Sequence, residues 1–400
     1  MPDDNVSFSA AEQALGYFYQ PRYALLQLLR MSEDTRCFIE RDDDIDFTDA
    51  EEGRILASLK HKAPGDTLTD LSPDFWKSVR IWLTHYLRQD VSHASDSYFL
   101  FTTGAVTVGS FLEAFLPSTE RDASIRQLAI DVLAQTGSKT IKKTKALLDT
   151  LPEGQWPDFF NRITIFDNLE RIQDIPQLII NEKLRTVRPQ FRRPVYERLE
   201  GWWFNQCIEL LAGRRTEALK GSEVSEMLSF ITEQFRDDNL PIDFEGAEPE
   251  GGVNPETDDR IFVKQLRAIG LKSDRLTRAI LDYYRAFEQR GKWQRENVTL
   301  TGEIDKYDDR LVDEWARLRE IVFEELKEDS PEEILQQTGR KLLNQLSTSD
   351  HGNLRIRAGV TATYVTMGSY HMLANEETPR VHWHPRFIER MIEILRGGQS

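Results

Sequence analysis

The alternation of hydrophobic and polar positions predicts a mixture of helices and strands in the first half of the chain. Apolar residues recur at helical spacing in residues 9–31, so this segment is predicted to be a helix that Pro21 bends or splits. A second helix is predicted at residues 74–89, and strand-favouring residues fill the segments that begin at Tyr98 and Ile163. This order of helices and short strands indicates an α/β domain.

Residues 35–62 carry the most distinctive pattern, because two short apolar runs flank a crowd of carboxylates. The apolar runs are residues 37–39 and 55–57, and the polar segment that joins them contains Gly53. Apolar runs of this length joined by a polar loop with glycine predict a β-hairpin. The acidic side chains follow the first apolar run: Glu40, Asp42, Asp43, Asp44 and Asp46.

This hairpin offers the side chains that metal-assisted phosphodiester hydrolysis requires. Side chains alternate along a strand, so Ser58, Lys60 and Lys62 are expected on one face, beside the acidic residues. Carboxylate oxygens hold Mg²⁺, the metal activates a water, and a lysine offsets charge on the phosphate oxygens. The alternative is structural, since an acidic run is commonly a solvated loop and a strand lysine commonly protects a sheet edge.

The pattern becomes helical throughout after about residue 195. An acidic segment with several Gly and Pro, residues 237–258, is predicted to be a loop. The predicted helices are residues 197–211, 222–236, 259–269, 273–290, 302–328, 331–346 and a last one from Pro385. We therefore expect an α/β domain at residues 1–195, with a helical insertion at about residues 117–155, and an all-α domain at residues 196–400.

Composition narrows the class of protein and its compartment. A chain of 400 residues exceeds what a single core usually supports, which also favours two domains. The formal net charge of −16 repels polyanions, so nucleic-acid binding would require local basic patches or a partner. No apolar segment is long enough to span a bilayer, and the acidic N-terminus is unlike a signal peptide. Cys37 and Cys207 lie in apolar contexts, which indicates reduced cysteines in a cytoplasmic protein.

Two clusters of basic residues have the density needed to follow a phosphate backbone. The first consists of lysines of one predicted helix: Lys139, Lys142, Lys143 and Lys145. The second is the densest group of arginines in the chain: Arg185, Arg188, Arg192 and Arg193. A solvated helix face explains the lysines equally well, and the prolines within the arginine cluster suit a linker between domains.

Several blocks in the first quarter of the chain, taken in order, resemble one family of nucleases. The blocks are GYFYQPRYALLQLL, IERDDDIDF, ILASLKHK, LTDLSPDFWKSVRIW and FLFTT. This order is similar to the nuclease domain of CD-NTase-associated double-stranded-DNA endonucleases, a branch of the PD-(D/E)xK superfamily. The resemblance implies a restriction-endonuclease-like fold for residues 1–195.

Later blocks resemble the C-terminal domain of ABC-three-component systems. These blocks are ERLEGWWFNQCIELL, FRDDNLPIDF, DRIFVKQLRAIG, RAILDYYRAFEQRGKWQREN, and MGSYHMLA with VHWHP. With the N-terminal blocks they make the chain similar to the nuclease-effector subunit of a Lamassu-type antiphage system. The resemblance implies that residues 196–400 bind a partner subunit.

The nuclease resemblance also implies a set of site residues. The family's hairpin acid corresponds to Asp44, with Glu40 and Asp43 as neighbours, so these three are expected to hold Mg²⁺ or Mn²⁺. The family's QxK arm corresponds to Ser58 and Lys60, and its first-helix glutamine corresponds to the amide immediately before Pro21, which is Gln20. Asp44, Lys60, Glu40, Ser58 and Gln20 are thus the expected catalytic residues. The chain departs from the family at Ser58, where a glutamine or an acid is usual.

The resemblance finally implies a context for the reaction. The expected partners are double-stranded DNA, an SMC-like or Rad50-like ATPase subunit that holds the nuclease inactive, and a small third subunit. Activation would accompany assembly on foreign DNA, with the nuclease as a homo-oligomer and no membrane involved. The basic residues expected to contact DNA are Lys62, Lys139, Lys142, Lys143, Lys145, Arg188, Arg192 and Arg193. The alternative hypothesis is a catalytically degenerate adaptor that mediates only complex assembly, which Ser58 favours.

Overall fold

The computed structural model of the protein describes residues 5–49, 53–88, 96–117, 119, 124–348, 351–387 and 389. The chain divides into two compact units, Met1–Ile231 and Thr232–Ser400. The boundary expected at residues 195/196 lies within helix α7 (Pro189–Leu211). This helix belongs to the first unit because it packs on α1 (Asn5–Arg30), where Trp203 Nε1 donates to the carbonyl oxygen of Pro21 at 2.6 Å.

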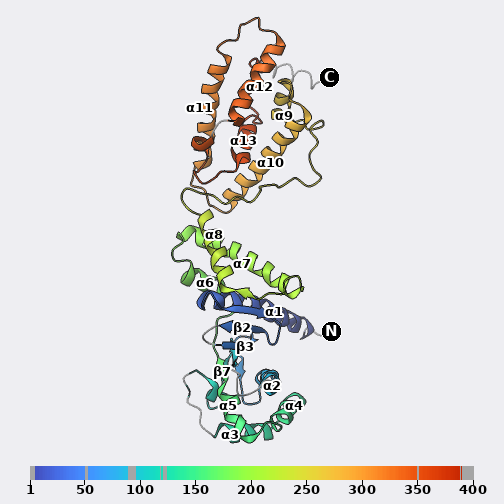
Figure 1. Ribbon diagram of the computed structural model, residues 1–400, viewed down its shortest axis with the longest axis vertical. Helices are drawn as coiled ribbons and strands as arrows, with labels where there is room; N and C mark the ends of the chain where they lie inside the picture. The colour runs from blue at the N-terminus through green and yellow to red at the C-terminus, as the bar shows by residue number, and fades with distance from the viewer. Residues whose placement is uncertain are drawn as a thin grey trace. The chain divides into compact units, whose positions relative to one another are not determined.

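The described residues of the first unit form a six-stranded mixed sheet, which confirms the α/β character (Figure 1). Its strand order is β7-β5-β3-β2-β1-β8. Neighbours β3, β5 and β7 are parallel, and the remaining neighbours are antiparallel. The strands are β1 (Arg36–Ile39), β2 (Ile45–Asp49), β3 (Gly53–Lys60), β5 (Ser97–Thr102), β7 (Ile163–Phe166) and β8 (Leu219–Lys220). A separate parallel pair joins β4 (Thr67–Leu68) to β6 (Ala105–Val106).

The predicted two-stranded hairpin is wrong in one respect, because β2 lies between its two apolar runs. Ile39 of β1 pairs with Ile45 of β2, which pairs in turn with Ala57 of β3. The carboxylates of β2 concealed this strand in the sequence. Asp46 is nevertheless almost fully buried, because the guanidinium groups of Arg41 and Arg54 bind its carboxylate.

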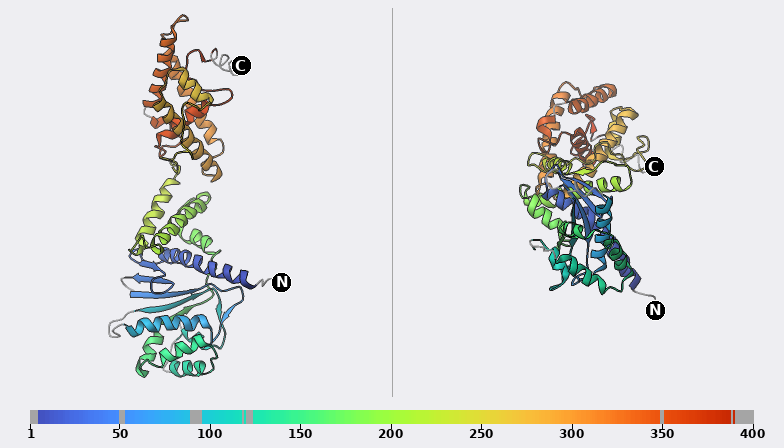
Figure 2. Two further views of the ribbon diagram at one scale, coloured as in Figure 1. Left: turned by 90° about the vertical axis from the view of Figure 1, so that its right-hand side faces the viewer. Right: turned by 60° about the horizontal axis from the view of Figure 1, so that its bottom comes forward.

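Helices cover both faces of the sheet (Figure 2). On one face lie α1, α6 (Ile175–Lys183) and α7, and α8 (Gly221–Gln234) follows α7. α1 is a single helix that includes Pro21. The opposite face is covered by α2 (Pro73–Arg88), α3 (Ile125–Ala134), α4 (Lys139–Leu148), α5 (Trp156–Asn161) and two short 3₁₀ helices, η1 (Phe111–Phe115) and η2 (Glu153–Gln155).

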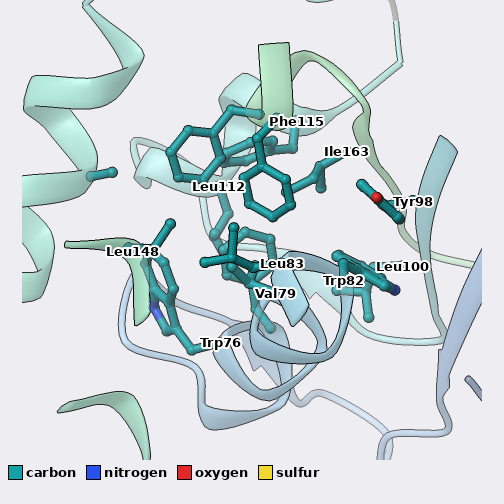
Figure 3. Close-up of a cluster of buried hydrophobic side chains, with 14 of the residues drawn as sticks. Trp76, Val79, Trp82, Leu83, Tyr98, Leu100, Leu112, Phe115, Leu148 and Ile163 are labelled. Carbon is teal, nitrogen blue, oxygen red and sulfur yellow. The ribbon is translucent and has the colours of Figure 1, made fainter. Parts of the chain in front are cut away.

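The main core of the first unit fills the space between the sheet and α2 (Figure 3). Trp76, Val79 and Trp82 of α2 are fully buried there, against residues of β5, η1, α4 and β7. Full burial of a large apolar side chain stabilises the fold by about 1.5–3 kcal/mol. The Thr144 hydroxyl of α4 donates to the carbonyl oxygen of Trp76 at 2.9 Å, so α4 is fixed on α2.

Every regular element within the described part of the second unit is a helix. These are α9 (Ile261–Ala268), α10 (Ser273–Arg295), α11 (Glu303–Phe323), α12 (Glu332–Thr348), η3 (His351–Leu354) and α13 (Thr363–Leu373). α13 was not predicted, because most of its residues are buried and leave no amphipathic stripe. The helix predicted from Pro385 onward lies almost wholly outside the described residues. None of the described helices combines the length and apolar character needed to cross a membrane.

Candidate functional site

The candidate site lies where the β1–β2 loop meets the carboxyl end of β3. Glu40 begins this loop with a positive φ of 54°, a backbone conformation that residues other than glycine rarely adopt. Its amide donates to the carbonyl oxygen of Asp44 at 3.1 Å and closes the loop. The turn presents the side chains of Glu40 and Asp44 to α1 and β3.

Asp44 is held by contacts from two sides. Its Oδ2 accepts hydrogen bonds from the backbone amide of Leu59 at 2.6 Å and from Lys60 Nζ at 3.0 Å. Its Oδ1 accepts from Gln20 Nε2 at 3.1 Å. The carboxylate is therefore fixed in position, and its ion pair with Lys60 stays partly open to solvent, with the two side chains 20% and 23% exposed.

Gln20 joins the two carboxylates of the site. Besides its bond to Asp44, Gln20 Nε2 donates to Glu40 Oε1 at 2.9 Å, and the glutamine is only 6% exposed. The two carboxylates repel each other, and the positive charge of Lys60, which pairs with Asp44, offsets part of this repulsion. The structure thus brings together Gln20, Glu40, Asp44 and Lys60 from α1, the β1–β2 loop and β3.

These side chains offer a donor set that suits a hard divalent cation. Mg²⁺ in proteins is commonly held by one or two carboxylates, with waters and substrate oxygens completing its shell. Glu40 and Asp44 provide two such carboxylates beside the amide of Gln20. Within the described ranges, no group of three or more His, Cys, Asp and Glu side chains is placed to hold a metal. A cation here would therefore depend on this carboxylate pair.

Asp43 is separated from the cluster. Its Oδ2 accepts from Trp82 Nε1 at 2.6 Å, and its Oδ1 accepts from the backbone amide of Asp44 at 2.9 Å. Burial, together with the charge of Asp44, raises the pKa of Asp43 to about 7. The structure gives Asp43 a role in joining the β1–β2 loop to α2.

Ser58 belongs to the cluster but lies behind it. Its Oγ donates to Asp44 Oδ2 at 3.4 Å and accepts from Ser78 Oγ at 2.7 Å. The residue is only 1% exposed, so Ser78 occupies the space that a longer side chain at this position would need.

Sequence reasoning missed one face of α2. Asp74, Ser78 and Trp82 are spaced four residues apart and therefore share a face. They contact Lys62, Ser58 and Asp43, respectively. The signal was present in the sequence, since a carboxyl, a hydroxyl and an indole at this spacing place three polar groups on a mostly apolar helix face.

The predicted basic residues fall into two groups on opposite faces of the sheet (Figure 2). Lys62 lies just beyond β3 and pairs with Asp74. On α4, Lys139, Lys142 and Lys143 are exposed, whereas Lys145 pairs with Asp149.

The arginines lie at or just before the start of α7, and two of them form local contacts that stabilise this part of the fold. Arg192 donates to the carbonyl oxygens of Val187 and Arg185 at 2.9 and 3.1 Å, and Arg193 pairs with Glu197 at 2.6 Å. Arg188 is exposed at the N-cap of the helix.

One family model matches part of the chain. Residues 262–391 match C-terminal domain 7 of the ABC-three component (ABC-3C) systems. This match supports the expected relation to that family of antiphage systems, and it lies within the second unit. No curated protein matches the chain.

Two solved structures show weak similarity. They are the Cap4 SAVED/CARF-domain containing receptors of Moraxella osloensis and of Acinetobacter baumannii, the latter with the cyclic trinucleotide 2'3'3'-cAAA. Their identities are 14% and 11% and their TM-scores 0.32 and 0.34, each over 64% of this chain. The matches span 59% and 58% of those receptors, less than two thirds of their length. Similarity at this level carries no argument about fold or activity.

Proposed function

We propose that the protein is a metal-dependent DNA endonuclease that serves as the effector of an ABC-three-component antiphage system. The observation that carries the proposal is the convergence of Gln20, Glu40, Asp44 and Lys60 at the end of β3. The first unit is then a restriction-like nuclease, and its mixed sheet is compatible with that class.

Each side chain has a role that follows from its contacts. Glu40 and Asp44 would hold Mg²⁺ or Mn²⁺, which when bound supplies the positive charge that activates water and neutralises the phosphate. Gln20 fixes the spacing of the two carboxylates. The Leu59 amide fixes Asp44 Oδ2. Lys60 presents a partly exposed ammonium group where charge develops on the phosphate oxygens.

The match of residues 262–391 supports a role within a multi-subunit complex. We assign the second unit to the binding of an SMC-like or Rad50-like ATPase subunit, together with a small third subunit, as in Lamassu-type systems. In this arrangement the ATPase subunit keeps the nuclease inactive. Assembly on foreign DNA then brings nuclease copies together, and two symmetry-related sites cut both strands.

Cleavage of supercoiled plasmid by the purified full chain tests the proposal. With Mg²⁺ present, we expect nicked and linear products from the wild type and a loss of about 10²-fold or more in Lys60→Ala. The matched control is Lys220→Ala, which removes an exposed lysine from edge strand β8 of the same sheet. Equal cleavage by Lys60→Ala and Lys220→Ala would overturn the assignment of Lys60.

The adaptor hypothesis remains the second candidate, and one observation favours it. Ser58 supplies a buried hydroxyl where related nucleases carry an amide or a carboxylate. If the wild type leaves plasmid intact with both Mg²⁺ and Mn²⁺, alone and with its partner subunits, yet still binds those subunits, the adaptor hypothesis replaces the nuclease.

A further inference from the structure

The outer face of α2 carries three basic side chains, those of Lys77, Arg80 and Arg88. The apolar side chains of Ile81 and Leu87 are exposed on the same helix. After Asp74, the helix contains no Asp or Glu as far as Arg88. Lys77, Arg80 and Thr84 follow at spacings of three and four residues, so they lie along one ridge. In a chain whose formal net charge is −16, this helix carries only basic charged side chains after Asp74.

α4 lies beside this ridge and extends it. The helix contains four lysines and no acidic residue. Its Ile141 and Thr144 face the core, which leaves Lys142 and Lys143 exposed. Between α2 and α4 runs a groove of about 390 Å³, lined by Arg80, Ile81, Thr84, His85, Lys143 and Leu147. Over the described residues, none of Arg80, Lys142 and Lys143 forms an ion pair with a carboxylate.

The basic ridge begins at the candidate site. The first turn of α2 carries Asp74, which pairs with Lys62 just beyond β3. Burial alone would raise the pKa of Asp74, but the hydrogen bond from Lys62 and the charges of Lys62, Lys60 and Lys77 hold it below its ordinary value. The Asp74 carboxylate is thus stabilised by the charges of three lysines: Lys60 of the site, Lys62 just beyond β3 and Lys77 of the ridge.

The arginine cluster of α7 does not continue this surface. It lies on the other face of the sheet, and Arg192 and Arg193 are engaged by backbone carbonyls and by Glu197 (Figure 2). The two clusters therefore cannot contact one straight duplex from the same protomer. The α2–α4 face is joined to the candidate site through α2, where Asp74 pairs with Lys62 and Ser78 donates to Ser58.

We propose that the α2–α4 face, formed by Lys77, Arg80, Lys142 and Lys143, binds the phosphate backbone of double-stranded DNA and leads one strand to Lys60 and Asp44. The choice of ligand rests on the proposed nuclease function. The 16 residues of α2 span about 24 Å, which corresponds to about seven base pairs of duplex. A phosphate backbone lying along this length would meet Lys77 on the ridge and the groove between Arg80 and Lys143.

Binding of a fluorescent 20-base-pair duplex to the full chain in EDTA tests the proposal without requiring cleavage. The test variant combines four changes on the α2–α4 face: Lys77→Gln, Arg80→Gln, Lys142→Gln and Lys143→Gln. The matched control removes the same charge from the opposite face: Lys183→Gln, Arg185→Gln, Arg188→Gln and Arg193→Gln. Fluorescence anisotropy is measured from 50 to 200 mM salt, with circular dichroism to confirm that both variants are folded.

We expect the test variant to bind at least tenfold more weakly than the wild type at 50 mM salt, and the control to bind like the wild type. Each lost phosphate contact reduces the magnitude of the negative slope of log affinity against log salt by about 0.9, so the loss of four contacts reduces it by about 3–4. Wild-type affinity in the test variant, equal losses in both variants, or no duplex binding by the wild type would overturn the proposal. Tighter binding of double-stranded RNA of the same sequence would overturn the choice of DNA.

The binding measurements test the DNA-binding surface independently of the proposed cleavage activity. Lys60→Ala should weaken duplex binding much less than the α2–α4 variant, because it removes one cationic side chain and the variant removes four. If the α2–α4 variant loses binding as expected while no condition yields cleavage, the surface stands and the nuclease function fails.

Discussion

Ser78 of α2 donates a hydrogen bond of 2.7 Å to Ser58 of β3, directly behind the ion pair of Asp44 and Lys60. Both serines are 1% exposed. The contact determines which side chains the position of Ser58 accepts, since the helix already fills the space that an amide or a carboxylate would occupy.

Ser58→Gln should therefore destabilise the protein. The added atoms must displace Ser78, and overpacking of this kind costs about 1–3 kcal/mol. Ser58→Ala should cost less, because the Ser78 hydroxyl can then donate to the carbonyl oxygen of Asp74, which lies 3.1 Å away. Urea unfolding of both variants at one pH gives the comparison. A Ser58→Gln protein as stable as the wild type would show that the space behind the site is open.

Gln20→Glu should make the thermal stability of the protein depend on divalent cations. A third carboxylate beside Glu40 and Asp44 adds repulsion in EDTA, so the melting temperature should fall below that of the wild type. Mg²⁺ should then raise the melting temperature of the variant more than that of the wild type, because binding to the folded state stabilises it. The matched control is Gln177→Glu on α6, an exposed position away from the site. Identical Mg²⁺ shifts in both variants would argue against a cation site at Glu40 and Asp44.

The two buried histidines of the second unit should lower its free energy of unfolding as the pH falls below about 6.5, against the opposite effect of Asp282, whose pKa burial raises to about 6. Burial lowers the pKa of His371 to about 3, and burial with the charge of Arg319 lowers that of His382 to about 4. The unfolded chain then binds protons that the folded chain excludes, so each histidine removes about 1 kcal/mol of unfolding free energy per pH unit below 6.5. Urea titrations between pH 7 and 5.5 measure the slope. His371→Leu should flatten it, and an unchanged slope in this variant would contradict the prediction.

Gly368→Ala should strongly destabilise the crossing of α10 and α13. A Cβ atom at Gly368 would overlap the carbonyl oxygen of Asp282 and the side chain of Ala286 on α10. The matched control is Gly201→Ala in α7, where nothing lies within 4 Å of the added atom and the change should stabilise the helix by about 0.5–1 kcal/mol. Thermal unfolding of the two variants should thus move in opposite directions, and a shift of the same sign in both would refute the packing argument.

Local patterns determined which segments form most of the regular elements. Amphipathic spacing located α2 and the long helices of the second unit, and strand-favouring runs located β3, β5 and β7, because these preferences act within a few residues of sequence. Several elements were not predicted, among them β2, α13 and the short strand β8, which lies within the segment expected to be all-α. β2 contains two buried carboxylates, Asp46, which Arg41 and Arg54 bind, and Asp49, which accepts from Thr35. α13 is buried on nearly all sides.

The sequence, through its resemblance to a nuclease family, also determined which residues are candidates for the site. Only the tertiary structure decided which of them meet. Gln20 reaches Glu40 and Asp44 across 20 and 24 residues of chain. Asp43, the neighbour of Asp44, turns instead to Trp82. Of the two basic clusters, only the lysines of α4 share a face of the sheet with α2, whose first turn lies at the site. The physical reason is that side-chain convergence depends on how helices and strands pack, and packing joins residues that sequence spacing leaves unrelated.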